Sequence, residues 1–312
     1  MANRVSAMTL GVDVCKDWLD ICDGERVWRI ANTAAAVQQL LSDIEGALRV
    51  ALEPTQRYHY RLLQSLLAAG HTVYLVDGYR VSRYRDAVGL RAKTDACDAR
   101  LLHRYVSAEA PQLQPYYLAP KAVRQLQQLL RARARLTVSK GVIGQSLQGI
   151  GTLAVTRKAL LARLQQAIRL IDRKLQRCLE TTPYGADAAR CRAIPGIGPL
   201  TSVALVATYH RGSFRSADAY IAYLGMDIRV RESGRYRGQS KLSKRGDPEL
   251  RRLLFNAARS AARTRDWRDY YERQRARGRS TTAAYVALAR KLARVAYALL
   301  RDQSNYREVA IA

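Results

Sequence analysis

The stretch Met8-Thr9-Leu10-Gly11-Val12-Asp13-Val14 is mostly apolar and carries a single acid near its end. A short apolar run of this kind is typical of a strand buried inside a sheet. Working outward, Asn32-Thr33 is a suitable N-cap for a helix that extends to Leu48. The other expected elements are strands at Trp18–Cys22, 26–30, 49–53 and 72–76, and a helix at 57–69. This alternation predicts an α/β sheet whose strands are buried on both faces.

The rest of the chain is expected to be mostly helical. Residues 82–109 have a helical pattern, and residues 120–179 form a long stretch rich in Leu, Gln and Arg that Gly149-Ile150-Gly151 interrupts. An antiparallel helical hairpin or coiled coil fits this stretch, and two ordinary core helices fit it nearly as well. Further helices are expected near 199–209, 216–224, 247–264 and 280–301, with a basic, loop-like segment at 227–246. We therefore expect three domains, at 1–112, 113–185 and 186–312.

The charge of the chain indicates a polyanionic partner. It has 53 Lys and Arg against 26 Asp and Glu, a formal net charge of +27 and a pI of about 10.5. Such a surplus repels itself unless a polyanion neutralises it, and nucleic acid is the first candidate. A membrane surface is the alternative, but there is no long apolar run, signal peptide or lipidation motif. Arg outnumbers Lys, which suits phosphate binding and base stacking, although a GC-rich genome has the same effect.

The five cysteines include no CxxC pair, so neither a zinc site nor a disulfide framework is expected. A reducing cytoplasm is the simplest compartment for such a chain. Together with the charge, this predicts a cytoplasmic protein with no membrane partner.

Four acids stand out in a chain with few of them. Asp13 and Glu53 lie near the ends of expected strands, and Asp95 and Asp98 lie at i and i+3 after Thr94, on one face of an expected helix start. Because ligands gather at the carboxyl ends of strands, the four carboxylates can converge, and Mg²⁺ (or Mn²⁺) would relieve their repulsion. The alternatives are that Asp95 and Asp98 only stabilise a helix N-terminus, and that Glu53 is a solvated strand end.

Two segments of the second half are candidates for contact with nucleic acid. In Pro195-Gly196-Ile197-Gly198, Gly196 and Gly198 resemble those of a helix-hairpin-helix loop, where backbone N–H groups approach a phosphate, although a tight core turn fits as well. The loop at 227–246 contains Ser233, Ser240 and Ser243 and many cations, and the residues alone do not single out one serine. The cations suited to holding a phosphate are Arg231, Arg235, Arg237, Lys241, Lys244 and Arg245.

Several motifs occur together in an order that resembles a known family. They are Gly11-Val12-Asp13-Val14-Cys15-Lys16, Leu52-Glu53-Pro54-Thr55, Lys93-Thr94-Asp95-Ala96-Cys97-Asp98-Ala99, Ile194-Pro195-Gly196-Ile197-Gly198, Tyr223-Leu224-Gly225-Met226, Arg231-Glu232-Ser233-Gly234 and Ser243-Lys244-Arg245-Gly246-Asp247. This ordered set resembles the DEDD transposases of the insertion sequence one-ten family, the bridge-RNA-guided recombinases. The resemblance spans nearly the whole chain. It departs from the family at Pro54-Thr55-Gln56, where a small residue and Thr-Gly are usual, so Glu53 is its least secure position.

The resemblance carries its own expectations. It implies an RNase H-like, RuvC-like N-terminal domain, a metal-binding tetrad of Asp13, Glu53, Asp95 and Asp98, and Ser233 as a nucleophile that forms a covalent phosphoserine link to DNA. It also implies donor and target DNA, a noncoding guide RNA, a homo-oligomer such as a dimer or tetramer, and a nucleoid-associated location in a bacterium or an archaeon. Two other hypotheses stay open: a Mg²⁺-dependent, structure-specific nuclease that uses water as its nucleophile, and a nucleic-acid-binding protein without catalysis.

Overall fold

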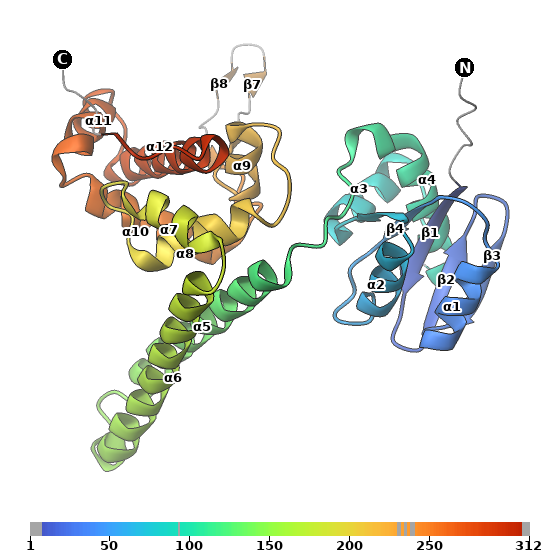
Figure 1. The fold of residues 1–312 in the computed structure, drawn as a ribbon, viewed down its shortest axis with the longest axis horizontal. Helices are drawn as coiled ribbons and strands as arrows, with labels where there is room; N and C mark the ends of the chain where they lie inside the picture. The colour runs from blue at the N-terminus through green and yellow to red at the C-terminus, as the bar shows by residue number, and fades with distance from the viewer. Residues whose placement is uncertain (1–7, 93, 230–231, 234–235, 238–240, 308–312) are drawn as a thin grey trace. The chain divides into compact units, whose positions relative to one another are not determined.

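The computed structural model describes residues 8–92, 94–229, 232–233, 236–237 and 241–307. The chain forms two compact units, Met1–Leu118 and Ala119–Ala312 (Figure 1). The helical pair that the sequence suggested as a separate segment belongs to the second unit. No helix in the described ranges is both long and apolar enough to cross a membrane.

The first unit is built on a mixed sheet of five strands in the order β3-β2-β1-β4-β5. The strands are β1 (Met8–Val14), β2 (Trp18–Cys22), β3 (Val27–Ala31), β4 (Leu48–Leu52) and β5 (Thr72–Leu75). β2 pairs antiparallel with β1 and β3, whereas β4 pairs parallel with β1 and β5. The expected α/β sheet is confirmed.

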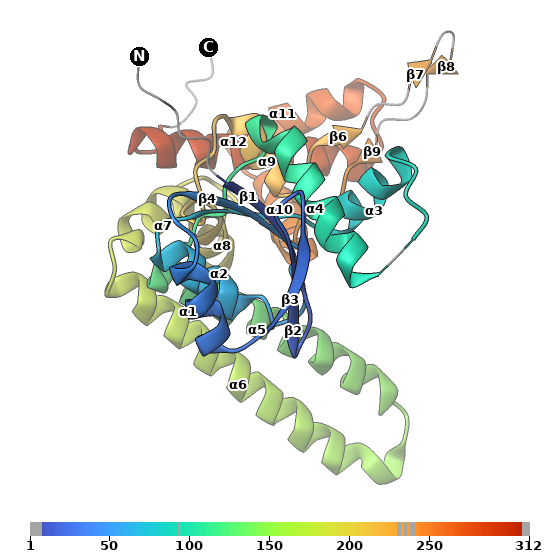
Figure 2. The same ribbon diagram turned by 90° about the vertical axis from the view of Figure 1, so that its right-hand side faces the viewer.

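Helices cover both faces of this sheet (Figure 2). On one face, α1 (Ala34–Ser42) and α2 (Tyr60–Ala68) pack against side chains such as Leu10, Val12 and Val14 of β1. On the other face lie α3 (Gly78–Ala87) and α4 (Asp95–Glu109), followed by a short 3-10 turn, Ala110–Gln112. Because side chains alternate along a strand, Gly11 and Asp13 face α4.

The first helix is shorter than the sequence suggested. Thr33 caps it as expected, accepting a hydrogen bond from the backbone N–H of Ala36 at 3.3 Å. The expected end at Leu48 is wrong: the helix ends at Ser42, and Leu48 is the first residue of β4, paired with Met8 and only 1% exposed. The leucine has helical spacing, but burial in the sheet decides its conformation.

The second unit begins with an antiparallel helical hairpin of α5 (Lys121–Ser146) and α6 (Ala154–Glu180). A 3-10 turn, Gly151–Leu153, lies between them at the expected break. Arg133 Nε donates to Asp172 Oδ1 at 2.5 Å and Lys140 Nζ to Gln165 Oε1 at 2.6 Å, which fixes the antiparallel register. The base of the hairpin is buried in the core of the C-terminal helices.

That core is formed by helices α7 (Tyr184–Arg192), α8 (Pro199–Tyr209), α9 (Ala217–Tyr223), α10 (Pro248–Ala261), α11 (Arg265–Ala276) and α12 (Thr281–Asp302). The sequence did not indicate α7 and α11. The expected loop at 227–246 contains short paired strands in its described parts: β6 (Ile228–Arg229) with β9 (Lys241–Leu242), and β7 (Glu232–Ser233) with β8 (Tyr236–Arg237). The mostly helical second half is confirmed.

Candidate functional site

Two adjacent parallel strands place the first pair of acids. Asp13 is the last but one residue of β1, and Glu53 directly follows Leu52, the last residue of β4. Val12 and Leu52 are partners in the parallel register, so Asp13 and Glu53 are the next residues along two neighbouring strands. Both side chains are half-buried at the carboxyl edge of the sheet.

The second pair of acids comes from the first turn of α4. Thr94 caps this helix by accepting a hydrogen bond from the Cys97 N–H at 3.3 Å, and Asp95 and Asp98 follow. Gly11 lets α4 approach β1 closely: a Cβ at Gly11 would lie 2.2 Å from both the Ala99 carbonyl oxygen and the His103 backbone nitrogen. The missing side chain therefore brings the start of α4 toward Asp13.

The charges of the four carboxylates act on one another. The pKa of Asp13 is raised to about 6, first by burial and then by the negative charges of Asp98, Asp95 and Glu53, against one backbone hydrogen bond that lowers it. The structure thus places Glu53, Asp95 and Asp98 close enough for their charges to act on Asp13, and of these three, Asp95 has a carboxylate oxygen within 4.8 Å of one of Asp13. A group of oxygen donors with this much mutual repulsion suits a hard divalent cation.

Glu53 has a further neighbour that the sequence did not reveal. A Cβ at Gly78, the first residue of α3, would lie 2.5 Å from Glu53 Oε1. The glycine leaves room for the carboxylate beside the N-terminus of this helix, whose partial positive charge stabilises an acid. This location supports Glu53 as a member of the acidic group despite its unusual Pro54-Thr55-Gln56 context.

Cys15 is also part of the site. Its Sγ, one Asp13 carboxylate oxygen and one Asp95 carboxylate oxygen all lie within 4.8 Å of one another. Burial and then the charge of Asp13 raise the pKa of the Cys15 thiol. Its place two residues after Asp13 was the only signal in the sequence, because the thiol belongs to no metal-binding motif.

Two arginines hold the acids of this site. Arg29 binds buried Asp20 through Nε to Oδ1 at 3.1 Å and Nη2 to Oδ2 at 3.0 Å, and its Nη2 also donates to Asp95 Oδ2 at 3.2 Å. Asp13, Asp20 and Arg29 are cross-strand partners on β1, β2 and β3 and share one face of the sheet. Because this proximity depends on strand register, the sequence pattern missed Asp20 and Arg29.

Asp98 has its own cationic partner. Arg85 of α3 forms an ion pair with it, and each side chain is only 14% exposed. The two arginines therefore offset part of the repulsion among the acids, and they orient Asp95 and Asp98.

The second unit contains the other candidate residues. Ser233 lies in β7, with Tyr236 of β8 as its partner. Arg231 and Arg235 fall outside the described residues, and Arg237 belongs to β8. Lys241, Lys244 and Arg245 are exposed. Ser243 Oγ donates to Asp227, which gives this serine a local structural role.

The two candidate glycines in the turn between α7 and α8 have different surroundings. Gly196 has a φ of +95°, and a Cβ there would lie 2.5–2.7 Å from atoms of Ala261. Core packing thus accounts for this glycine. Gly198 is the N-cap of α8, and a Cβ there would meet nothing within 4 Å, so the helix N-terminus is open to approach.

Comparison with known proteins connects both units to one family. Residues 188–272 match the "Transposase IS116/IS110/IS902 family", and residues 10–150 match a transposase family named DEDD_Tnp_IS110. The chain is 26% identical to a pilin gene-inverting protein of Moraxella bovis, over 97% of this chain and 98% of that one. It is 26% identical to a probable family 20 transposase of Pseudomonas aeruginosa, over 96% and 98% of the two chains.

A third relative, the transposase for insertion sequence element IS1111A of Coxiella burnetii, is 24% identical over 96% of this chain and 91% of its own. These matches cover both units in the order in which the chain presents them. The protein belongs to the IS110/IS116/IS902 family of transposases and is a DNA recombinase.

Proposed function

We propose that this transposase is an RNA-guided recombinase that cuts and rejoins DNA through Ser233, with the tetrad of Asp13, Glu53, Asp95 and Asp98 holding a catalytic divalent metal. The observation that carries the proposal is the convergence of Glu53, Asp95 and Asp98 on Asp13, whose pKa is raised to about 6 by burial and by these three charges. The mixed five-stranded sheet supports the RNase H-like fold implied by the resemblance.

The covalent step is a transesterification. The Ser233 oxygen attacks a DNA phosphorus, a bond forms between that oxygen and phosphorus, and the bond to one deoxyribose oxygen breaks. The serine proton is lost to a base, and the departing oxygen gains a proton to become a hydroxyl. A hydroxyl of another strand then reverses these changes, so rejoining needs no external energy source.

The tetrad suits Mg²⁺, or Mn²⁺, because all four side chains offer carboxylate oxygen. When bound, such an ion polarises a phosphoryl oxygen and lowers the pKa of a hydroxyl on the attacking group. Arg29 and Arg85 keep Asp95 and Asp98 in place beside Asp13. Ser233 belongs to the second unit and the tetrad to the first. The proposal therefore requires Ser233 and the tetrad, from one copy of the chain or from two, to meet on the DNA.

The guide RNA and the oligomer rest on the resemblance and on two features of the chain. The net charge of +27 can neutralise RNA as well as DNA. Large apolar side chains are exposed toward the far end of the hairpin, including Val142 at 55% and Val155 at 83%. Such a patch is suited to contact with a second copy, because solvent-exposed apolar side chains are stabilised by burial in an interface.

The test is recombination in cells that carry the gene with its native flanking DNA, which would supply the guide RNA. Wild type should produce new DNA junctions, and Ser233→Ala and Asp13→Asn should each abolish them. Ser139→Ala on the exposed face of α5 is the matched control and should behave as wild type. A protein–DNA adduct that survives boiling in detergent should form with wild type and be absent with Ser233→Ala.

The nuclease alternative predicts a different pattern. If DNA cleavage is lost in Asp13→Asn but continues in Ser233→Ala, without a protein–DNA adduct, the nucleophile is water and not Ser233. Junctions that form after the flanking RNA-coding DNA has been deleted would refute guidance by that RNA and leave the serine chemistry intact.

A further inference from the structure

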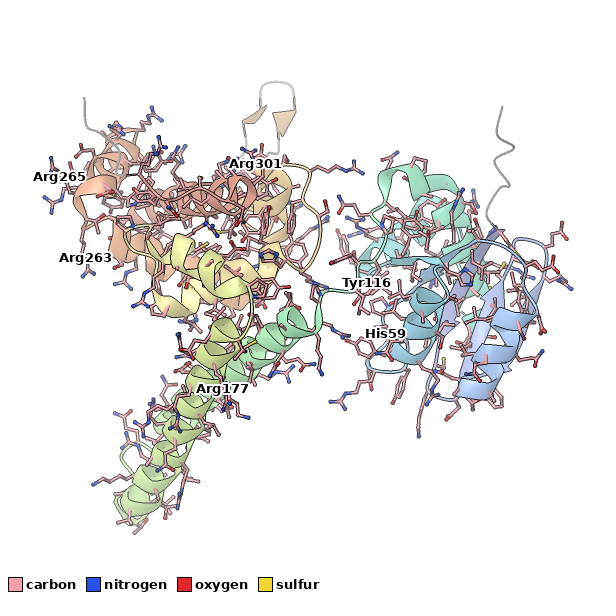
Figure 3. All side chains as sticks on the ribbon, in the orientation of Figure 1. His59, Tyr116, Arg177, Arg263, Arg265 and Arg301 are labelled. Carbon is pink, nitrogen blue, oxygen red and sulfur yellow. The ribbon has the colours of Figure 1, made fainter. Side chains whose placement is uncertain are left out.

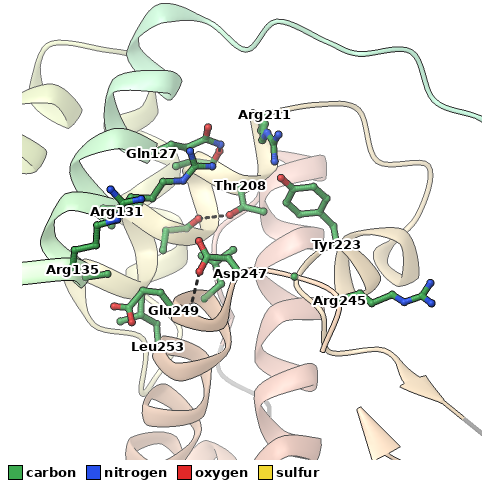
Figure 4. Close-up of a pocket in the computed structure, with 16 residues that line it drawn as sticks. Gln127, Arg131, Arg135, Thr208, Arg211, Tyr223, Arg245, Asp247, Glu249 and Leu253 are labelled. Atoms are coloured by element: carbon green, nitrogen blue, oxygen red, sulfur yellow. Dashed lines mark hydrogen bonds between the residues drawn. The ribbon is translucent and has the colours of Figure 1, made fainter. Parts of the chain in front are cut away.

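The second unit contains a cavity whose lining includes Arg245 of the basic loop but neither Ser233 nor any of the four acids. It has a volume of about 480 Å³ and lies between α5, α8, the end of α9 and the start of α10 with the residues just before it (Figure 4). This volume lies in the range of roughly 300–1,000 Å³ that is usual for sites that bind small molecules. A flat or shallow surface would not hold a bound group in this way.

The floor of the cavity is apolar. It is formed by Leu130 and Ala134 of α5, Ala204 of α8, and Leu250 and Leu253 of α10. These side chains offer no hydrogen bonds, so they favour contact with an apolar surface such as the face of a nucleobase.

The rim of the cavity is cationic and has one aromatic face. Arg131 and Arg135, one turn apart on α5, lie on one side, and Arg211 and Tyr223 lie on the other (Figure 4). The Arg211 guanidinium carbon is 5.4 Å from the centre of the Tyr223 ring, which is a cation–π pair. Arg131 and Arg135 are exposed, and neither forms an ion pair with a carboxylate in the described part of the chain.

Four polar side chains that line the cavity each form at least one hydrogen bond within the protein. Gln127 Nε2 donates to the Ala207 carbonyl at 3.0 Å, and Thr208 Oγ1 donates to the Ala204 carbonyl at 2.7 Å. Asp247 accepts from the Glu249 N–H at 2.8 Å, and Glu249 binds Arg252. Because these groups are engaged, the cavity is suited to holding a base by shape and stacking, with little reading of its identity.

From this combination we infer that the cavity binds one unpaired nucleotide of a single strand. The base enters between the apolar floor and the Arg211–Tyr223 pair, and Arg131 and Arg135 bind the adjoining phosphates. Arginine suits this role because its guanidinium binds phosphate through two N–H groups. A base inside a duplex cannot enter, so the cavity distinguishes an extruded or single-stranded nucleotide from paired DNA.

The shared ligand chemistry has two possible sources, a DNA strand opened during recombination and a guide RNA. The experiment therefore measures binding of fluorescein-labelled 12-nucleotide single-stranded DNA, RNA of the same sequence, and the DNA duplex. The full chain is used in EDTA, so the metal site and the Ser233 reaction do not contribute, and failure here is distinct from failure of the proposed function.

Two variants test the cavity. Ala134→Phe fills it and keeps every arginine, while Arg131→Gln/Arg135→Gln removes the phosphate contacts and leaves the floor unchanged. Each should weaken binding of at least one single strand by about tenfold, the effect of losing one stacked base, and weaken duplex binding far less. The double glutamine variant should also reduce the slope of log affinity against log salt by about 1.4 for two lost phosphate contacts.

The control is Arg173→Gln/Arg177→Gln on α6, which removes the same charge at the same spacing outside the cavity. Both arginines are exposed, and Arg177 extends from the hairpin in Figure 3. If Ala134→Phe weakens binding of the DNA strand, the RNA strand or both, then the cavity binds DNA, RNA or both, respectively. Wild-type affinity of Ala134→Phe for both strands would overturn the proposal, as would an Arg131/Arg135 loss no larger than in the control. If Ala134→Phe lowers the Tm, its effect on binding is set aside. The proposal is then tested by whether Arg131→Gln/Arg135→Gln weakens single-strand binding more than Arg173→Gln/Arg177→Gln does.

Discussion

Gly11→Ala tests whether the approach of α4 to β1 assembles the acidic group. A Cβ at this position would lie 2.2 Å from the Ala99 oxygen and the His103 nitrogen, and both are backbone atoms that cannot rotate away. To reach ordinary contact, about 3.4 Å, the helix must retreat by about 1 Å. Such overpacking should cost about 1–3 kcal/mol of unfolding free energy. Because Asp95 and Asp98 move with the helix, we expect Mn²⁺ affinity to fall by about tenfold or more.

The assay is urea unfolding in a Trp267→Phe background, with Mn²⁺ binding measured by calorimetry. Tryptophan fluorescence then reports on the first unit, because Trp18 and Trp28 both lie there. Gly141→Ala is the control: it lies in the exposed part of α5, and a Cβ there would meet nothing within 4 Å. It should leave Mn²⁺ binding unchanged. If Gly11→Ala unfolds at the wild-type urea concentration and binds Mn²⁺ as wild type does, close packing of α4 does not position the acids.

Three further predictions follow from individual side chains. Without metal, the folded protein binds the Asp13 proton more tightly than the unfolded chain does, so the stability of the first unit should fall as pH rises from about 4 through about 6. Asp13→Asn should remove this dependence and, in urea titrations at pH 7.5, raise the unfolding free energy by about 1–2 kcal/mol, the shift being discounted for the partial exposure of Asp13; an unchanged pH profile would contradict the raised pKa. Cd²⁺ should produce a thiolate absorption band that Cys15→Ser lacks, because sulfur is a soft ligand beside the carboxylates, and a band that persists would place the Cd²⁺ elsewhere. Val142→Glu/Val155→Glu should lower the mass measured by light scattering if the hairpin joins two copies, and an unchanged mass would exclude that contact.

The sequence identified the four acids because local chemistry limits where they can lie. An acid at the end of an apolar strand, and two acids in the first turn after a capping threonine, have few alternative positions. The antiparallel hairpin could also be predicted from the sequence, since two long helical patterns with a glycine break between them favour this arrangement. The end of the first helix, at Ser42 and not at Leu48, could not be predicted, because the spacing of the leucines suits both a helix and a buried strand.

Composition and motifs by themselves determined the nucleic-acid partner, the α/β first half and the family, since charge, periodicity and ordered motifs are properties of the chain. Only the tertiary structure decided that Cys15, Asp20, Arg29 and Arg85 surround the acids. Strand register and helix packing bring these residues together across separate elements, and no spacing along the chain encodes that proximity. The cavity lined by Arg131 and Tyr223 arises in the same way, because the helices that form it meet only in the folded unit.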